Sequence, residues 1–176
     1  MKKIMLVCAA MMSFGVTASA QFISVDNVSI PLYEDTSCHI PIATIFQDSV
    51  TENYYRVDIT DENNNCFKVR IGSDWSNSDF QIIAWIDKKY VAVCNWPSWS
   101  LNHCVYLFAK PDKTSPKQVI HSYDITDWRS PVVSVSGDWY KIIVPTKNGQ
   151  REGWTLNYCP NIYGSCEGGT DYINIP

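Results

Sequence analysis

Short runs in which apolar and polar residues alternate recur along the whole chain, and no stretch carries a sustained helical period. In the first half, residues 55–59 (YRVDI) and 67–71 (FKVRI) each place an apolar side chain at every second position. This two-residue period is typical of strands with one buried face. Residues 61–65 (DENNN) lie between the runs and have the composition of a turn, so the pattern predicts a hairpin.

The second half has the same plan. Residues 133–136 (VSVS) alternate, residues 136–138 (SGD) predict a turn, and residues 139–144 (WYKIIV) alternate again, with Tyr140 facing inward and Trp139 outward. Residues 146–153 (TKNGQREG) contain Asn-Gly, a strong signal for a tight hairpin. These patterns predict an all-β protein.

The two halves align as a divergent tandem repeat. One unit extends from about Phe22 to Val93 and the other from about Cys104 to Cys166, and residues 94–103 (CNWPSWSLNH) have the Pro and Ser content of a linking loop. The aligned segments are VSIPLYEDTS with VYLFAKPDKTS, PIATIF with QVIHSY, CFKVRI with WYKIIV, and AWIDKKYV with GWTLNYC.

Residues 1–20 have the pattern of a secretory signal peptide, with Lys2 and Lys3, an apolar run and a terminal Ala-Ser-Ala. The apolar run is shorter than the roughly 20 residues that span a membrane, and no later segment reaches that length. We therefore expect cleavage after Ala20 and an exported product in the periplasm or outside the cell. Without Lys2 and Lys3 the net charge falls from −4 to −6, which argues against a nucleic-acid partner because that binding requires clustered Lys and Arg.

Six cysteines follow the predicted leader, an even number that indicates disulfides in an exported chain. Each unit carries one cysteine after its repeated tyrosine and another a short loop later, which predicts two local disulfides and leaves one remaining pair. Buried free thiols are the alternative. The three predicted pairs are Cys94–Cys104, Cys159–Cys166 and Cys38–Cys66.

The order of these motifs resembles the bacterial SH3 (SH3b) domain family, with LFAKPDKTSPKQVI, GDWYKI and REGWTLNY in the second unit and PLYED and AWIDKKYV in the first. The first unit departs from the family pattern, with Cys66 at the aromatic position and Ala84 at the glycine before the tryptophan. The resemblance implies two tandem SH3-like small barrels, at residues 21–93 and 104–176, that bind cell wall or peptide. Many relatives carry a C-terminal cysteine peptidase or amidase domain, for which the chain to Pro176 has no room. We therefore expect no enzyme activity.

Candidate chemistry is sparse. The pairs Cys38-His39 and His103-Cys104 are adjacent, and neighbours on a strand point to opposite faces, so neither pair makes its own nucleophile and base. The histidines lack ligand spacing, C-x-x-C pairs are missing, and the acidic pairs at 34–35 and 61–62 lack the spacing of a calcium loop. We expect no catalytic residue, metal or cofactor.

Aromatic content is the unusual feature, with seven Trp, ten Tyr and six Phe. Trp85 and Trp154 end the last hairpin of their units and are expected to be structural and partly buried, with Tyr90 and Tyr158. The other tryptophans of interest occur in polar loops, where they either close the open ends of the two small barrels, pack between the units, or bind a ligand. The predicted ligand contacts are Trp75, Trp96, Trp99, Trp128 and Tyr33.

The expected ligand of these aromatic loops is a cell-wall glycan or peptide, with peptidoglycan or its stem peptides implied by the SH3b resemblance. The alternative is a protein partner, as for a secreted inhibitor or an immunity-type protein.

Overall fold

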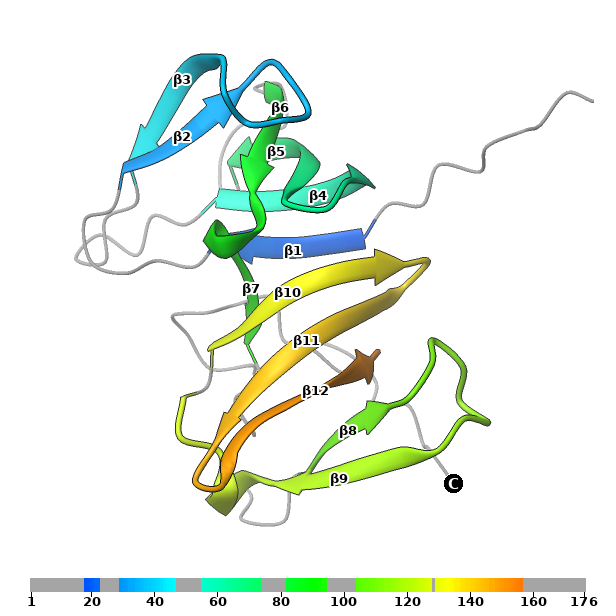
Figure 1. The fold of residues 1–176 in the computed structure, drawn as a ribbon. Helices are drawn as coiled ribbons and strands as arrows, with labels where there is room; N and C mark the ends of the chain where they lie inside the picture. Colours follow the sequence, from blue (N-terminus) through cyan, green and yellow to red (C-terminus); the bar gives the residue numbers. More distant parts are fainter. Residues whose placement is uncertain are drawn as a thin grey trace, which may run out of the picture.

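The computed structural model describes residues 18–22, 29–46, 55–73, 82–94, 104–127 and 129–156, and side chains at 18–22, 55–57, 72–73 and 94 are not described. Within these residues the chain forms strands and two single-turn 3-10 helices (Figure 1). The strands of the first half are β1 (Ala18–Phe22), β2 (Ser29–Tyr33), β3 (Pro41–Phe46), β4 (Tyr55–Glu62), β5 (Cys66–Ser73) and β6 (Ile82–Asp87). Those of the second half are β7 (Val91–Cys94), β8 (Cys104–Phe108), β9 (Lys117–His121), β10 (Arg129–Ser136), β11 (Trp139–Thr146) and β12 (Gly149–Thr155). The 3-10 helices are η1 (Lys88–Tyr90) and η2 (Ser122–Asp124).

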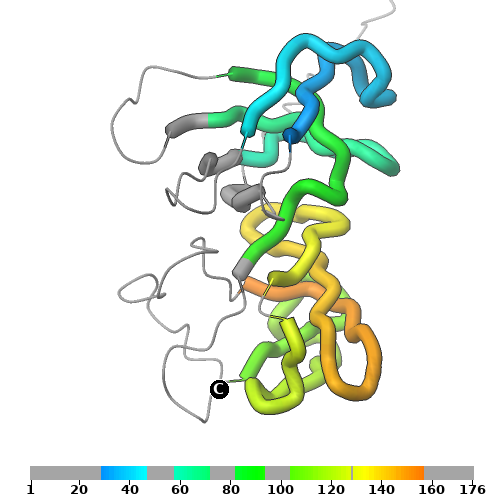
Figure 2. The backbone as a smooth tube through the Cα atoms, turned by 90° about the vertical axis from the view of Figure 1, so that its left-hand side faces the viewer, coloured from blue at the N-terminus to red at the C-terminus, as the bar shows by residue number. Residues whose placement is uncertain are grey.

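The strands form two antiparallel sheets joined through β10, whose first residues pair with β7 and whose later residues pair with β11. The neighbouring strands follow the order β3-β2-β6-β5-β4-β1-β7-β10-β11-β12-β8-β9. Read outward from the centre, the first half gives β1, β4, β5, β6, β2 and β3, and the second half gives β7, β10, β11, β12, β8 and β9. Each strand of the second half therefore corresponds to the strand of the first half whose number is lower by six. The halves are thus related by an approximate two-fold axis between β1 and β7, with the first half above and the second below in Figure 1 and Figure 2.

Residue register supports this symmetry. Ser19 pairs with Asp58 on β4, and Ala92 pairs with Pro131 on β10, so both members lie 73 residues further along the chain. The next pairs, Ala20 with Val57 and Val93 with Ser130, keep the same offset. A two-fold axis requires such matched pairs on both sides, so the repeat detected in the sequence is also a repeat of strand pairing.

The predicted hairpins are confirmed. β4 pairs with β5, β10 with β11 and β11 with β12, and the β4–β5 and β10–β11 ladders shift register at equivalent positions, after Ile59 and after Val132. The Asn63 side chain stabilises the first turn: its Oδ1 accepts hydrogen bonds from the backbone N–H groups of Asn65 and Cys66. Gly149 supplies the positive φ of 99° that the last hairpin requires.

Equivalent positions form the core. Phe67 and Tyr140 are both fully buried, and Tyr140 faces inward as its alternation predicts, whereas Trp139 is half-exposed. A hydrophobic cluster contains residues of both halves and also Val91 and Val93 of β7. The two halves therefore share apolar contacts along the strand that links them.

A polar latch adds to these apolar contacts between the halves. The Lys88 ammonium in η1 lies 2.9 Å from Glu62 Oε2 and donates to the carbonyl of Val133 on β10, also at 2.9 Å. Ser134 Oγ on β10 donates to the other oxygen of Glu62 at 2.6 Å. The Lys88 ammonium also sits 4.6 Å from the centroid of the Phe67 ring. Because these groups come from η1, β4 and β10, the latch fixes the relative position of the two halves.

The all-β prediction is confirmed, but the described strands do not close either sheet into a barrel: β3 and β9, at the two ends of the order, pair on one side only. β7, at the end of the predicted first domain (21–93), pairs with β10 of the second half. β1 also includes residues 18–20, the end of the predicted leader. In the described part of the chain, no helix has the length and apolar character needed to cross a membrane.

Candidate functional site

A row of side chains crosses the outer face of the first half. Pro41, Tyr33, Trp85, Lys68 and Asp61 are direct partners on five consecutive strands, from β3 to β4. Side chains directly opposite on antiparallel strands share one face of the sheet. Trp85 is 8% exposed and Tyr33 is half-exposed, so the row combines a covered indole with a more accessible phenol.

An equivalent row crosses the second half. Lys117, Phe108, Trp154, Lys141 and Ser134 are direct partners from β9 to β10. Trp154 lies opposite Lys141 as Trp85 lies opposite Lys68, which confirms that the two tryptophans are equivalent. The predicted equivalence of Tyr90 and Tyr158 involves a residue outside the described part of the chain. We call these two sets of five residues the aromatic rows.

Strand alternation explains why the aromatic rows face outward. Leu32 and Ala84, the neighbours of Tyr33 and Trp85, are buried in the core. Adjacent strand residues point to opposite faces, so Tyr33 and Trp85 must face away from that core. In the second half alternation also places Phe108 on the face opposite Leu107, but both side chains are buried, and Phe108 is contacted by Trp139 and Lys117.

The row of the second half is stiffened by further contacts. Phe108 and Trp139 meet edge to face with centroids 5.3 Å apart and planes at 82°. The Lys117 ammonium lies 5.0 Å from the Tyr106 ring centroid and 5.9 Å from that of Phe108, within cation–π range. Lys141 forms an ion pair with Glu152 at 2.5 Å. These contacts bury the Phe108 ring, whereas Tyr106, Trp139 and Trp154 stay half-exposed.

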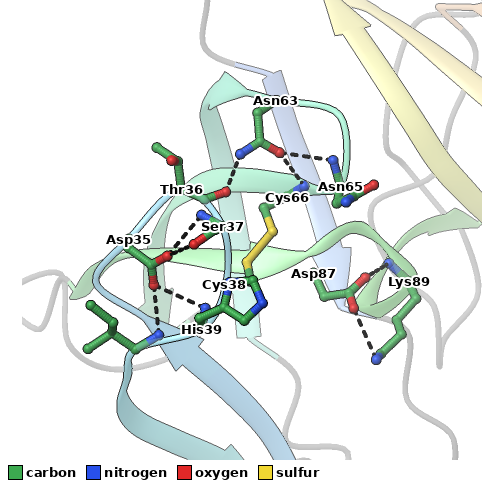
Figure 3. Close-up of a disulfide and its surroundings, with 11 residues drawn as sticks. Asp35, Thr36, Ser37, Cys38, His39, Asn63, Asn65, Cys66, Asp87 and Lys89 are labelled. Carbon is green, nitrogen blue, oxygen red and sulfur yellow. Dashed lines mark hydrogen bonds and ion pairs between the residues drawn. A yellow bond between two sulfur atoms is a disulfide. The ribbon is translucent and has the colours of Figure 1, made fainter.

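In the first half, a disulfide occupies the place of that aromatic packing (Figure 3). Cys66 begins β5 as Trp139 begins β11, and it is bonded to Cys38 in the loop after β2, as the sequence predicts. Cys38 has a φ of 57°, a left-handed conformation that is costly for residues other than glycine. Cys66 is buried.

The loop after β2 is also ordered by one carboxylate. Asp35 accepts hydrogen bonds from the backbone N–H groups of Ser37, His39 and Ile40, and from the Ser37 hydroxyl (Figure 3). The Ser37 hydroxyl bond and the Ile40 N–H bond hold the pKa of Asp35 far below its usual range. Asn63 Nδ2 donates to the carbonyl of Thr36 and joins this loop to the first hairpin turn. The predicted solvated turn at 34–35 is therefore a loop built around its carboxylate.

Asp112 has the same role in the second half. It accepts from the Thr114 N–H at 2.9 Å and from the Thr114 hydroxyl at 2.7 Å. These two hydrogen bonds, led by that of the backbone N–H, lower the pKa of Asp112. The motif Asp-x-Ser in the first loop and Asp-x-Thr in the second is the signal that could have identified both loops from sequence.

Large apolar side chains are exposed beside the row of the first half. Ile40, Ile42 and Phe46 are 55%, 50% and 68% exposed along the edge strand β3 and its entry, and Ile83 on β6 is 64% exposed. Residues 40–46 (IPIATIF) contain no charged residue. The opposite edge strand, β9, carries Lys117 and His121 instead. Charged side chains commonly protect edges from pairing with other chains, so β3 is the less protected edge.

One pair of reactive side chains was missed by the sequence reasoning. Cys104 Sγ lies 3.2 Å from His121 Nδ1, because the two residues are direct partners on β8 and β9. Cys104 and His121 are far apart along the chain, so only the register of β8 and β9 reveals this pair. The His121 ring also stacks on Tyr123, with centroids 5.1 Å apart. A catalytic thiol needs an orienting group and an oxyanion site in addition, and we assign the pair no catalytic role.

Most predicted site residues lie outside the described residues. Trp75, Trp96, Trp99 and Trp128 are among them, and so are Cys159 and Cys166; the side chain of Cys94 is also not described. Their predicted roles and pairings stay predictions. Tyr33 is described and takes part in the first aromatic row. Among the described residues there is no group of three His, Cys, Asp or Glu side chains placed to hold a metal ion.

Comparison of the chain with family models, with curated proteins and with solved structures found no match.

Proposed function

We propose that the protein is an exported, non-catalytic binding module that recognises a cell-envelope ligand, peptidoglycan or its peptides, through outward-facing aromatic residues. The observation that carries this proposal is the pair of aromatic rows at equivalent positions of the two halves. Aromatic rings stack on sugar faces and clasp extended peptides, and Tyr33 and Trp154 are the half-exposed rings of the two rows. The resemblance of the motifs to SH3b domains supports the same ligand class.

Export is supported by two independent features. Residues 1–20 have the pattern of a leader, and the Cys38–Cys66 disulfide is compatible with an oxidising compartment. Two tandem SH3-like barrels, implied by the SH3b resemblance, are part of the proposal. The tryptophans at 75, 96, 99 and 128, expected from the sequence to contact the ligand, are part of the proposal as well.

Sedimentation with purified cell wall tests the proposal. We expect the protein to pellet with the wall, and Tyr33→Ala to weaken that binding without a large change in melting temperature, because Tyr33 is only half-buried. The same experiment applies to the alanine variants of the four loop tryptophans. Tyr123→Ala is the matched control, since Tyr123 is exposed but lies outside both rows. No sedimentation of the folded protein would reject the cell-wall ligand.

The second candidate is a protein partner, as for an inhibitor or immunity-type protein. The uncharged and exposed edge strand β3 favours it, because an open edge can accept a strand of another chain. Phe46→Lys places a charge on this edge and should abolish such binding, whereas Val119→Lys on β9 should not. Capture of one protein with no sedimentation on cell wall would favour this candidate over the first.

A further inference from the structure

Strand β1 extends across the predicted end of the leader. Ala18, Ser19 and Ala20 pair with Ile59, Asp58 and Val57 on β4. Beyond the predicted cleavage point, Gln21 pairs with Arg56 on β4 and with Ala92 on β7, and Phe22 pairs with Val91 on β7. The bond between Ala20 and Gln21 therefore lies inside a strand that is held from both sides.

The position of β1 within the strand order makes the Ala20–Gln21 bond an unusual processing site. β1 lies in the middle of the order, between β4 and β7; Gln21 pairs with both neighbours, and residues 18–20 pair with β4. Proteolytic cleavage concentrates at exposed loops and termini whose backbone can leave the protein surface. The neighbouring positions Ile59, Val91 and Ala92 are fully buried, so releasing β1 would also expose apolar surface.

We propose that folding closes the Ala20–Gln21 bond to the leader peptidase, so that this bond must be hydrolysed before β1 docks between β4 and β7. The inference depends on the proposed export of the protein. Hydrolysis adds one water across the peptide bond and leaves a carboxylate on Ala20 and an ammonium on Gln21. The processed chain retains the pairs of Gln21 and Phe22, whereas the unprocessed chain retains the three pairs of residues 18–20 in addition.

Two consequences follow for the two forms of the chain. We call the region where β1, β7 and β10 pair the seam between the halves. A chain that folds with its leader attached stays uncut, because cleavage then requires local opening of this seam. That unprocessed form also unfolds at a higher temperature than the processed form, because β4 keeps its partners at positions 57–59. Whether cleavage or folding comes first, rather than the sequence at the cleavage point, determines whether the processed or the unprocessed chain accumulates.

The test uses the full chain and a purified type I signal peptidase in detergent. The folded chain and the same chain unfolded in urea are cleaved at a urea concentration that the peptidase tolerates, and the product is identified by its N-terminal residue. We expect the unfolded chain to yield Gln21 as its N-terminus and the folded chain to be cut at least about a hundredfold more slowly, because cleavage then follows the population of the open state.

Two proline variants sharpen the test. Arg56→Pro, which removes a backbone donor opposite Gln21, should speed cleavage of the folded chain. Thr44→Pro, on the edge strand β3 far from the seam, should leave it slow. Circular dichroism establishes that both variants are folded; if Arg56→Pro is not, the rate for the wild-type chain should instead rise with the unfolded fraction across a urea titration.

The outcomes are distinct. Equal rates for folded and unfolded chain, with Gln21 as the product, would overturn this inference and leave the proposed export intact. Failure of the unfolded chain to be cut at Ala20 would overturn both.

Discussion

The two halves of the molecule have the same strand order and the same core positions, but they differ at the start of the central hairpin strand. In the first half Cys66 at this position is bonded to Cys38. In the second half Trp139 packs edge to face on Phe108. A covalent link and an aromatic contact thus stabilise equivalent surfaces. The comparison shows that the scaffold is set by the buried positions, whereas the outer face is free to diverge toward different chemistry.

The largest expected effect concerns the disulfide of the first half. Replacing both Cys38 and Cys66 by Ala should lower the free energy of unfolding by about 3.5 kcal/mol, the value for a loop of 28 residues in the chain-entropy model. Urea denaturation of the oxidised protein and of the variant measures it. As a control, a reducing agent should have a much smaller effect on the variant than on the wild type. Equal stability of the two oxidised proteins would show that the link is not needed in the first half.

The next effect concerns a close approach of β12 to β8 in the second half. A Cβ on Gly153 would lie 2.7 Å from Leu107 Cβ, so Gly153→Ala should destabilise the protein by about 2 kcal/mol through overpacking. Ala84 holds the equivalent position in the first half, where the strands already accept a methyl group. The matched variant Ala84→Gly should cost only about 1 kcal/mol. Thermal denaturation of both variants compares the halves, and a neutral Gly153→Ala would mean that β8 and β12 are further apart.

A smaller effect is expected from the latch between the halves. Lys88→Met keeps the aliphatic stem over Phe67 but removes the ammonium, and Glu62→Gln removes the charge that faces it. In a double-mutant cycle we expect a coupling energy of about 1 kcal/mol, since both side chains are largely but not fully shielded from water. A coupling near zero would show that this ion pair does not stabilise the arrangement of the halves.

The smallest effect is the pH dependence of the two loop aspartates. Both carboxylates have lowered pKa values, so the stability they contribute is present above the ordinary Asp pKa of about 3.9 and is lost as the pH falls through the lowered values. Asp35 accepts more hydrogen bonds than Asp112 and should titrate at the lower pH. NMR titration of the two carboxyl groups measures this order. Asp35→Asn should flatten the loss of stability below pH 4, and titration of Asp112 below Asp35 would contradict the account.

Much of the repeat could be predicted from sequence, because its signals are local. Alternation and turn residues identify the hairpins, and the two Gly/Ala-Trp motifs align Trp85 with Trp154. The Cys38–Cys66 pair was predicted as the remainder after two local disulfides, and it is confirmed.

The seam between the halves could not be predicted in this way. Alternation defines which residues face the core but not which strand lies beside which, so the pairing of β1 with β7 carries no signal in the sequence pattern. The pairing of residues 18–20 with β4 could not be read from the leader pattern either, and the predicted leader stays a prediction. The aromatic rows and the contact of Cys104 with His121 likewise depend on register between strands that are distant in sequence.

The most direct test of the account is the register across the seam. In NMR spectra of the protein, we expect backbone nuclear Overhauser contacts that link Gln21 to Ala92 on one side, and Val93 to Ser130 on the other. This pattern joins the halves through β1, β7 and β10, as the two-fold relation requires. Contacts of β7 with strands of the first half alone, with none to β10, would contradict it and would describe two independent units.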